Sequence, residues 1–183
     1  MINTIQDLRE YLRYEKKLYI HNNTKDKLLD IITNMPNIKI WKYVKLLRKT
    51  EYFYNNRRNP LFAIMYLLYR RRKNNLGLKL GIEIFENCFD KGLCIYHAGN
   101  IVVNGSAKIG KDCKLHGANC IGNSGVRLDN PVIGDNVRLG VGAKIIGGIE
   151  LADNTTIAAG AVVVHSFSET DTVLAGIPAK KIK

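Results

Sequence analysis

Residues 133–162 read IGDNVR LGVGAK IIGGIE LADNTT IAAGAV, which are five successive hexapeptides that each begin with Ile or Leu. The same count extends back to Val103 and forward to Val163, and it is interrupted once, at Arg127. A period of six fits neither the 3.6-residue repeat of a helix nor the two-residue alternation of a strand. It is typical of a β-solenoid, in which short strands alternate with tight corners. The pattern therefore predicts a mainly β fold with the aliphatic residues inside.

The residues between the aliphatic positions predict the corners of this solenoid. The position after the aliphatic is often glycine, as at Gly110, Gly134 and Gly140. We expect these glycines to relieve strained backbone at the corners. The interruption at residues 125–131 predicts a loop that leaves the coil, and it is either a functional loop or an insertion without contacts.

The net charge of +12 divides the chain into two parts. Residues 1–80 hold 18 Lys and Arg against 6 Asp and Glu, whereas residues 81–183 hold 10 of each. This shift in composition predicts a basic helical segment at residues 1–78 and a β-solenoid at residues 79–183. Apolar residues at helical spacing predict four helices in the first segment, the last one opening at Asn59-Pro60 and ending at Arg70–Lys73.

The basic helices are either a solvated surface or a site for something anionic. An anionic membrane surface, a phosphate-linked lipid carrier and a charged glycan all fit this charge, whereas no nucleic-acid module is recognisable. The first ten residues lack the apolar core of a signal peptide, and the longest apolar run, Leu61–Tyr69, is too short to span a bilayer. We therefore expect a cytoplasmic protein at the inner face of the cytoplasmic membrane.

The cysteines and histidines do not indicate a metal site. Cys88, Cys94, Cys113 and Cys120 form no Cys-x-x-Cys pair, so we expect reduced structural cysteines. His97, His116 and His165 are spaced too irregularly to meet at one metal ion. We expect no metal.

His97 is the polar residue that departs most informatively from the hexapeptide pattern. It falls on the six-count in place of an aliphatic residue, with the small residues Ala98 and Gly99 beside it. Glu83 precedes it by 14 residues, which is close to one coil of three hexapeptides. A carboxylate one coil away can orient an imidazole and leave its other nitrogen free to accept a proton. The pair therefore indicates a general base, whereas the alternative is a histidine satisfied within a core.

Four segments between residues 81 and 183 resemble the hexapeptide-repeat acyltransferases, in particular the serine acetyltransferase branch. They are Gly81-Ile82-Glu83-Ile84, His97-Ala98-Gly99-Asn100-Ile101-Val102-Val103, Gly140-Val141-Gly142-Ala143-Lys144 and Ala175-Gly176-Ile177-Pro178-Ala179. The resemblance implies a left-handed parallel β-helix, a homotrimer, and acetyl-CoA held between subunits. It also implies that His97 deprotonates an acceptor hydroxyl while Glu83 orients His97.

Further site residues are carried over from the same resemblance. It implies that CoA contacts Asn123, Ser124, Val141, Gly142, Ala159, Gly160 and Lys180. The acceptor is expected at Tyr96, Asn104 and His116, and His116 has a surface role as its alternative.

Three departures from the branch concern the groups that hold free serine. Tyr96 replaces an Asp before the histidine, Leu128-Asp129-Asn130-Pro131 stands where the branch has Asp-Arg-His-Pro, and the chain has no Asp-Pro. Losing a charged clamp weakens binding of a small zwitterion. The pattern resembles capsular or surface polysaccharide O-acetyltransferases, so a glycan or its precursor is the expected acceptor. A serine O-acetyltransferase of cysteine biosynthesis and a non-catalytic scaffold that binds an anionic surface are the alternatives.

Overall fold

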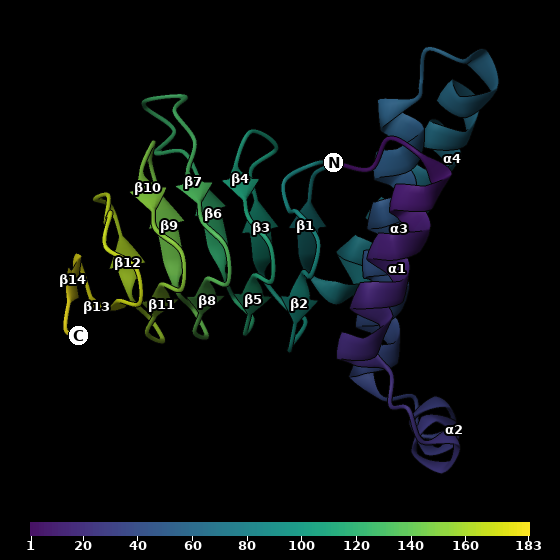
Figure 1. Ribbon diagram of the computed structural model, residues 1–183, viewed down its shortest axis with the longest axis horizontal. Coiled ribbons are helices and arrows are strands. Elements are labelled where there is room, and N and C mark those ends of the chain that lie inside the picture. The colour runs from purple at the N-terminus through teal and green to yellow at the C-terminus, as the bar shows by residue number, and fades with distance from the viewer. The chain divides into compact units, whose positions relative to one another are not determined.

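The computed structural model describes residues 1–183 as two compact units, residues 1–81 and 82–183 (Figure 1). The first unit contains the four helices α1 (Ile5–Tyr19), α2 (Thr24–Ile32), α3 (Pro36–Asn55) and α4 (Pro60–Leu80). The second contains the strands β1 (Ile82–Ile84), β2 (Cys94–Ile95), β3 (Ile101–Val103), β4 (Lys108–Ile109), β5 (Lys114–Leu115), β6 (Cys120–Gly122), β7 (Val132–Ile133), β8 (Arg138–Leu139), β9 (Lys144–Ile146), β10 (Glu150–Leu151), β11 (Thr156–Ile157), β12 (Val162–Val163), β13 (Val173–Gly176) and β14 (Ala179–Lys181).

The helix boundaries follow local capping chemistry. Thr4 caps α1 by accepting a hydrogen bond from the Asp7 amide, and the Asp7 carboxylate accepts one from the Thr4 amide in return. Asn59 caps α4 through the Leu61 amide. The sequence pattern ended α4 at the basic cluster, but the helix continues to Leu80. It stops at Gly81, whose φ of 64° is left-handed, as is common after the last helical residue.

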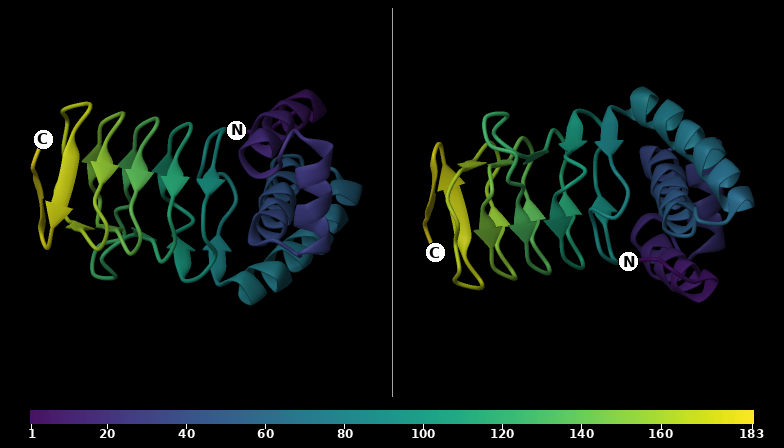
Figure 2. Two further views of the ribbon diagram at one scale, coloured as in Figure 1. Left: turned by 90° about the horizontal axis from the view of Figure 1, so that it is seen from below. Right: turned by 90° about the horizontal axis from the view of Figure 1, so that it is seen from above.

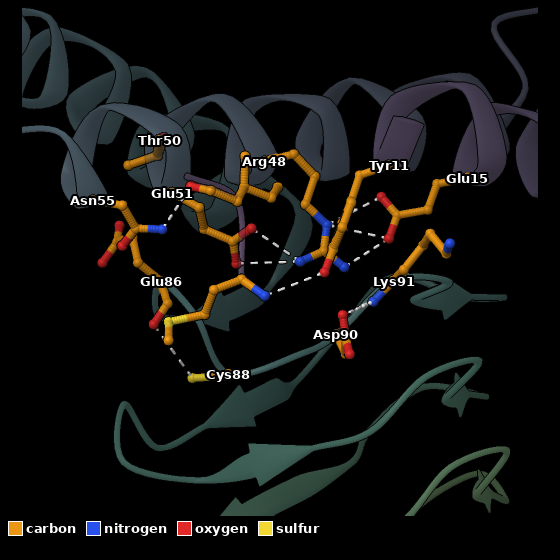
Figure 3. Close-up of polar contacts among 12 residues, drawn as sticks. Tyr11, Glu15, Arg48, Thr50, Glu51, Asn55, Glu86, Cys88, Asp90 and Lys91 are labelled. Carbon is orange, nitrogen blue, oxygen red and sulfur yellow. Dashed lines mark hydrogen bonds and ion pairs between the residues drawn. The ribbon is translucent and has the colours of Figure 1, made fainter. Parts of the chain in front are cut away.

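A buried ion cluster joins two helices of the first unit (Figure 3). Arg48 of α3 donates to Glu15 of α1 at 2.6 Å and to Glu51 at 2.9 Å, and its side chain is fully buried. Burial alone would lower the pKa of the Arg48 guanidinium, but the carboxylates of Glu51 and Glu15 outweigh it and raise the pKa. The guanidinium also lies 5.1 Å from the ring centroid of Tyr11. The cluster fixes how α1 packs on α3.

The second unit is a β-solenoid, as the six-residue period predicts (Figures 1 and 2). Its strands stack into three sheets, which we name the first sheet (β1-β3-β6-β9-β12), the second sheet (β10-β7-β4) and the third sheet (β14-β13-β11-β8-β5-β2). Every pairing between coils is parallel, and Ile82 lies beside Ile101 in the first of them. The aliphatic residues of the six-count are all buried: Val103, Ile109, Leu115, Ile121, Ile133, Leu139, Ile145, Leu151, Ile157 and Val163.

Two expectations about this fold need correction. The chain is a mixture of helix and sheet rather than mainly β, because its four helices hold more residues than its short strands. The glycines after the aliphatic positions are not there to adopt left-handed backbone. At Gly140 a Cβ would lie 2.6 Å from the Ala159 amide nitrogen, so close stacking of the coils requires glycine. Left-handed backbone occurs instead at the corner between the second and third sheets. It is adopted there by residues such as Asp112, Asn136 and Asn154.

The predicted excursion loop leaves the coil between β6 and β7, and the coil resumes in register after it. Lys108 still pairs with Val132 across the interruption. The loop exposes Val126 and Leu128, at 91% and 81% of their maximal area. At the other end of the second unit, β13 and β14 form an antiparallel hairpin. Among the helices of the first unit, none is long and apolar enough to cross a membrane.

Candidate active site

His97 lies at the corner that leads from the third sheet to the first. It follows β2 and precedes β3, and its side chain is exposed. Its ring forms no hydrogen bond and no ion pair within the chain, so the histidine is not satisfied within a core. A free imidazole on a rigid corner has the chemical capacity to exchange a proton with a bound hydroxyl.

The coils that follow His97 have mostly very small residues at the same corner. We call His97, Gly117, Val141, Gly142, Ala159 and Gly160 the His97 corner. Gly117 stacks directly on His97, because a Cβ there would lie 3.3 Å from the His97 Cβ. The Gly142 amide donates to the Gly117 carbonyl at 3.0 Å, and the Gly160 amide donates to the Val141 carbonyl at 2.8 Å. The structure thus aligns His97 with four of the predicted CoA residues: Val141, Gly142, Ala159 and Gly160.

Asn119 holds the His97 corner in place from inside the coil. Its buried amide donates to the carbonyls of Gly140 at 2.8 Å and Ala143 at 3.2 Å, and its oxygen accepts from the Gly117 amide at 3.0 Å. Buried polar side chains are retained when all their hydrogen bonds are made. Sequence reasoning missed this residue, although an Asn at a small interior position was a usable signal.

Tyr96 and His116 stack against each other on neighbouring coils. Their ring centroids are 4.5 Å apart and their planes differ by 23°. Burial, Arg138 and His97 all lower the pKa of His116, so this histidine is neutral at pH 7. Its Nε2 atom is buried and has no hydrogen-bond partner, which costs free energy. Burial, together with the Cys94 thiol, raises the pKa of the Tyr96 phenol.

Arg138 is a second residue that the sequence did not single out. It lies on β8, one coil above Lys114 of β5 in the third sheet, and it is exposed. Its charge acts on both His116 and Tyr96. Of the two neighbouring cations, Lys114 already donates a hydrogen bond to the Asn136 side chain. Arg138 is therefore the one that can pair with an anionic ligand.

The other predicted site residues form no hydrogen bond or ion pair with His97. No hydrogen bond or ion pair joins Glu83 to His97; Glu83 is exposed in the first sheet beside Val102. Asn104, Asn123 and Ser124 lie past the far ends of β3 and β6, where their side chains cap local turns by accepting from Ser106, Gly125 and Arg127. Lys180 is in β14, at the opposite edge of the third sheet from β2.

The thiols and acidic groups do not gather into a metal site. No group of three or more His, Cys, Asp or Glu side chains is arranged to hold an ion. All four cysteines are free, and burial raises the pKa of the Cys113 thiol to about 12. Cys113 is therefore a protonated interior residue at neutral pH.

Comparison with known proteins identifies the repeats. The family described as "Bacterial transferase hexapeptide (six repeats)" matches residues 130–165. This stretch is similar to the repeats of bacterial hexapeptide transferases. The match covers the coils from β7 to β12, which include the Val141–Gly142 and Ala159–Gly160 parts of the His97 corner. The hexapeptide assignment made from the sequence is confirmed.

Curated proteins similar to this chain include serine acetyltransferases. The enzyme of Synechococcus elongatus is 32% identical over 108 residues, which are 57% of this chain and 44% of the relative. The chain thus spans about half the length of the curated relatives it matches. The structure of soybean serine acetyltransferase superposes on 97% of this chain and 69% of its own, with 24% identity and a TM-score of 0.75.

A serine acetyltransferase in complex with CoA superposes equally well, with 22% identity and a TM-score of 0.75 over 97% of this chain and 71% of its own. Because the identities are low, these structures establish the fold, which is the left-handed β-helix with helices before it. The handedness implied by the sequence resemblance is therefore confirmed.

The expected glycan acceptor is wrong. We inferred it from the missing serine clamp, but the chain is similar in sequence and in structure to serine acetyltransferases. The error has a physical cause. A clamp missing from the expected sequence positions does not prevent other charged side chains, such as Arg138, from supplying one.

Proposed function

We propose that this protein is an acetyl-CoA-dependent serine O-acetyltransferase. The observation that carries the proposal is the His97 corner, where an unpartnered imidazole lies in line with glycine and alanine on the coils above it. The relatives, which are named serine acetyltransferases, supply the acceptor.

In the proposed reaction His97 acts as general base. It removes the proton from the serine hydroxyl while the hydroxyl oxygen attacks the thioester carbonyl. The tetrahedral intermediate collapses by breaking the carbon–sulfur bond, and the CoA thiolate takes the proton from protonated His97, which leaves CoA as a thiol and His97 neutral again. Amide donors at the corner stabilise the oxyanion, which is a large contribution in acyl transfer. The exposed Glu83 orients His97 once substrates exclude water.

We propose that Arg138 and His116 replace the missing serine clamp. The Arg138 guanidinium pairs with the serine carboxylate, because it has both the charge and the planar geometry for that group. Neutral His116 adds no positive charge beside Arg138, so the serine ammonium is not repelled there. Tyr96 fixes the His116 ring by stacking on it.

We propose that acetyl-CoA lies along the His97 corner of a homotrimer. Val141, Gly142, Ala159 and Gly160 leave room for the pantetheine arm beside one chain. Asn123 and Ser124 lie at a different corner of the coil, so they reach the same CoA molecule from a neighbouring copy. Lys180 then lies near the phosphorylated end, and Asn104 supports the corner below Gly122.

Thiol release from acetyl-CoA with and without L-serine tests this proposal. The wild-type protein should release thiol only when L-serine is present. His97→Ala should lower kcat by roughly 10²–10⁴-fold, which is the usual contribution of a general base. Release that is no faster with L-serine than without it would overturn the proposed function.

The role of Arg138 needs a separate comparison. Arg138→Gln should raise KM for L-serine at least about tenfold while leaving KM for acetyl-CoA unchanged. Lys108→Gln is the matched control, because Lys108 is an exposed cation on β4 in the second sheet. Ethanolamine has the hydroxyl and amine of serine without the carboxylate, so its slower turnover should be insensitive to Arg138→Gln. Equal loss with both substrates would exclude the carboxylate contact.

A further inference from the structure

The region around α4 carries positive charge with no acidic residue to balance it. Between Glu51 and Glu83 the sequence contains no Asp or Glu, but it contains Arg57, Arg58, Arg70, Arg71, Arg72, Lys73 and Lys79. None of the five arginines forms an ion pair. Three of them lie over tyrosine rings instead: Arg57 over Tyr54 at 3.9 Å, Arg70 over Tyr66 at 5.6 Å and Arg72 over Tyr69 at 5.9 Å.

The outer face of α4 also exposes a stripe of aliphatic side chains. Leu61, Ile64, Leu67 and Leu68 are 62%, 57%, 63% and 50% exposed, respectively. Their spacing places them on one side of the helix, and Arg71 and Arg72 continue the same side one turn later. We call these six residues the α4 face.

The aliphatic stripe is not needed for the packing of α4 on α3. The opposite side of α4 already supplies aromatic contacts: Phe62 lies 5.5 Å from the Phe53 ring, and Tyr69 stacks on Phe53 at 5.1 Å. Four exposed aliphatic residues on one helix side form a contiguous apolar surface, which in soluble proteins marks an interaction site.

We propose that the α4 face docks on the surface of an anionic phospholipid bilayer. A helix with aliphatic residues and arginines on one side, flanked by further arginines, suits the boundary between headgroups and acyl chains. A nucleic acid or a charged glycan would use the arginines but would leave the aliphatic stripe in water. A second copy of the helical unit would bring like charge against like charge, because residues 1–80 hold 18 basic and 6 acidic side chains.

The docking is superficial, and it is independent of the proposed acyl transfer. No helix is suited to crossing the membrane, so the aliphatic stripe inserts only to the depth of its side chains. Both forces contribute: the arginines attract anionic headgroups and the aliphatic residues leave water. Attachment should therefore require anionic lipid and weaken as salt screens the charges.

Co-sedimentation of the full chain with vesicles tests the docking. The protein should sediment with vesicles of phosphatidylcholine and phosphatidylglycerol at three to one, and not with phosphatidylcholine alone. Raising the salt from 50 to 500 mM should release most of it. Arg71→Gln with Arg72→Gln should weaken binding roughly 30-fold, since each interfacial cation contributes about 1 kcal/mol. Leu67→Ser with Leu68→Ser should weaken it at least about tenfold.

Two variants of α2 are matched controls. Leu28→Ser with Leu29→Ser removes leucines that are 56% and 59% exposed, and Lys25→Gln with Lys27→Gln removes the same charge. Both should bind vesicles as the wild type does. Unchanged L-serine-dependent thiol release in every variant should show that the site is intact, whatever the outcome for lipid.

Four results would overturn the proposal. The first is equal binding to both kinds of vesicle, and the second is equal loss in the α2 and α4 variants. The third is a change in sedimenting mass of the Leu67→Ser, Leu68→Ser protein without any loss of lipid binding, which would assign the α4 face to contact between copies. Binding to heparin but not to vesicles would likewise assign the arginines to a soluble polyanion.

Discussion

At the scale of single residues, Arg48 is the most constrained side chain of the helical unit. It is fully buried between the carboxylates of Glu15 and Glu51. Each buried charge is stabilised only while its partners of opposite charge are present. Removing one partner of a buried ion cluster costs more than the cluster contributes, because it leaves uncompensated charge in a medium of low dielectric constant.

We expect Arg48→Met to lower the free energy of unfolding by about 3–5 kcal/mol. Urea unfolding followed by the fluorescence of Trp41 measures this, since Trp41 is the only tryptophan and is buried in the helical unit. Arg13→Met, at an exposed position of α1, should change the value by no more than about 0.5 kcal/mol. Replacing Glu15 and Glu51 by Leu in the Arg48→Met protein should restore much of the loss. A change below about 1 kcal/mol for Arg48→Met would contradict the argument.

The site could be predicted from the sequence only where its residues interrupt a pattern. His97 was found because a polar residue fell on an aliphatic count, and Val141 and Gly160 were found by resemblance. Arg138 was not, because an outward-facing cation on a strand is common, and only the stacking of coils brings its charge near Tyr96 and His116. The role of Glu83 in orienting His97 stays a prediction. A spacing of one coil tells which coil a residue lies on, but not the direction of its side chain.

At the scale of elements, the β-solenoid depends on how closely successive coils approach. Gly140 of one coil meets the backbone of Ala159 in the next, and the Gly140 amide donates to the Ile157 carbonyl at 2.8 Å. A methyl group at Gly140 has no flexible side chain to displace, so the coils themselves must separate.

We expect Gly140→Ala to lower the free energy of unfolding by about 1–3 kcal/mol, the usual cost of overpacking. Calorimetric unfolding of the full chain measures the effect. Gly122→Ala is the matched control, because its Cβ would meet only the Asn104 side chain, at 3.3 Å. That substitution should be close to neutral, since alanine also reduces the entropy of the unfolded chain. If Gly140→Ala proves as neutral as Gly122→Ala, close stacking is not the reason for glycine.

The elements differ in how well the sequence specifies them. The six-residue count located the strands from β3 to β12, because buried aliphatic residues repeat wherever a strand crosses the interior. The end of α4 was misplaced by seven residues. Basic residues suit the last turn of a helix but do not stop it, and the left-handed Gly81 does.

At the scale of the whole molecule, the proposed function requires more than one chain. The predicted CoA residues lie on two corners of the coil, and the loop between β6 and β7 exposes Val126 and Leu128. Apolar side chains with such exposure are expected where another copy packs.

We expect sedimentation equilibrium to give a mass of about 62 kDa, three times the 20.6 kDa of one chain. Val126→Ser with Leu128→Ser should shift this mass toward the single chain and raise KM for acetyl-CoA, because CoA would lose its second set of contacts. Leu18→Ser, at a 43% exposed position of α1, should leave the mass unchanged. A mass near that of one chain at micromolar concentration would contradict the trimer.

The excursion loop has a consequence for how such proteins diversify. Backbone hydrogen bonds between coils set the register on both sides of the loop, so its length is not fixed by the coils. Doubling the length of a flexible loop costs only about 0.6 kcal/mol. Insertions and deletions in this loop should therefore cost a single coil little, so the loop can change in length while the coils are inherited unchanged, as long as Val126 and Leu128 still meet another copy.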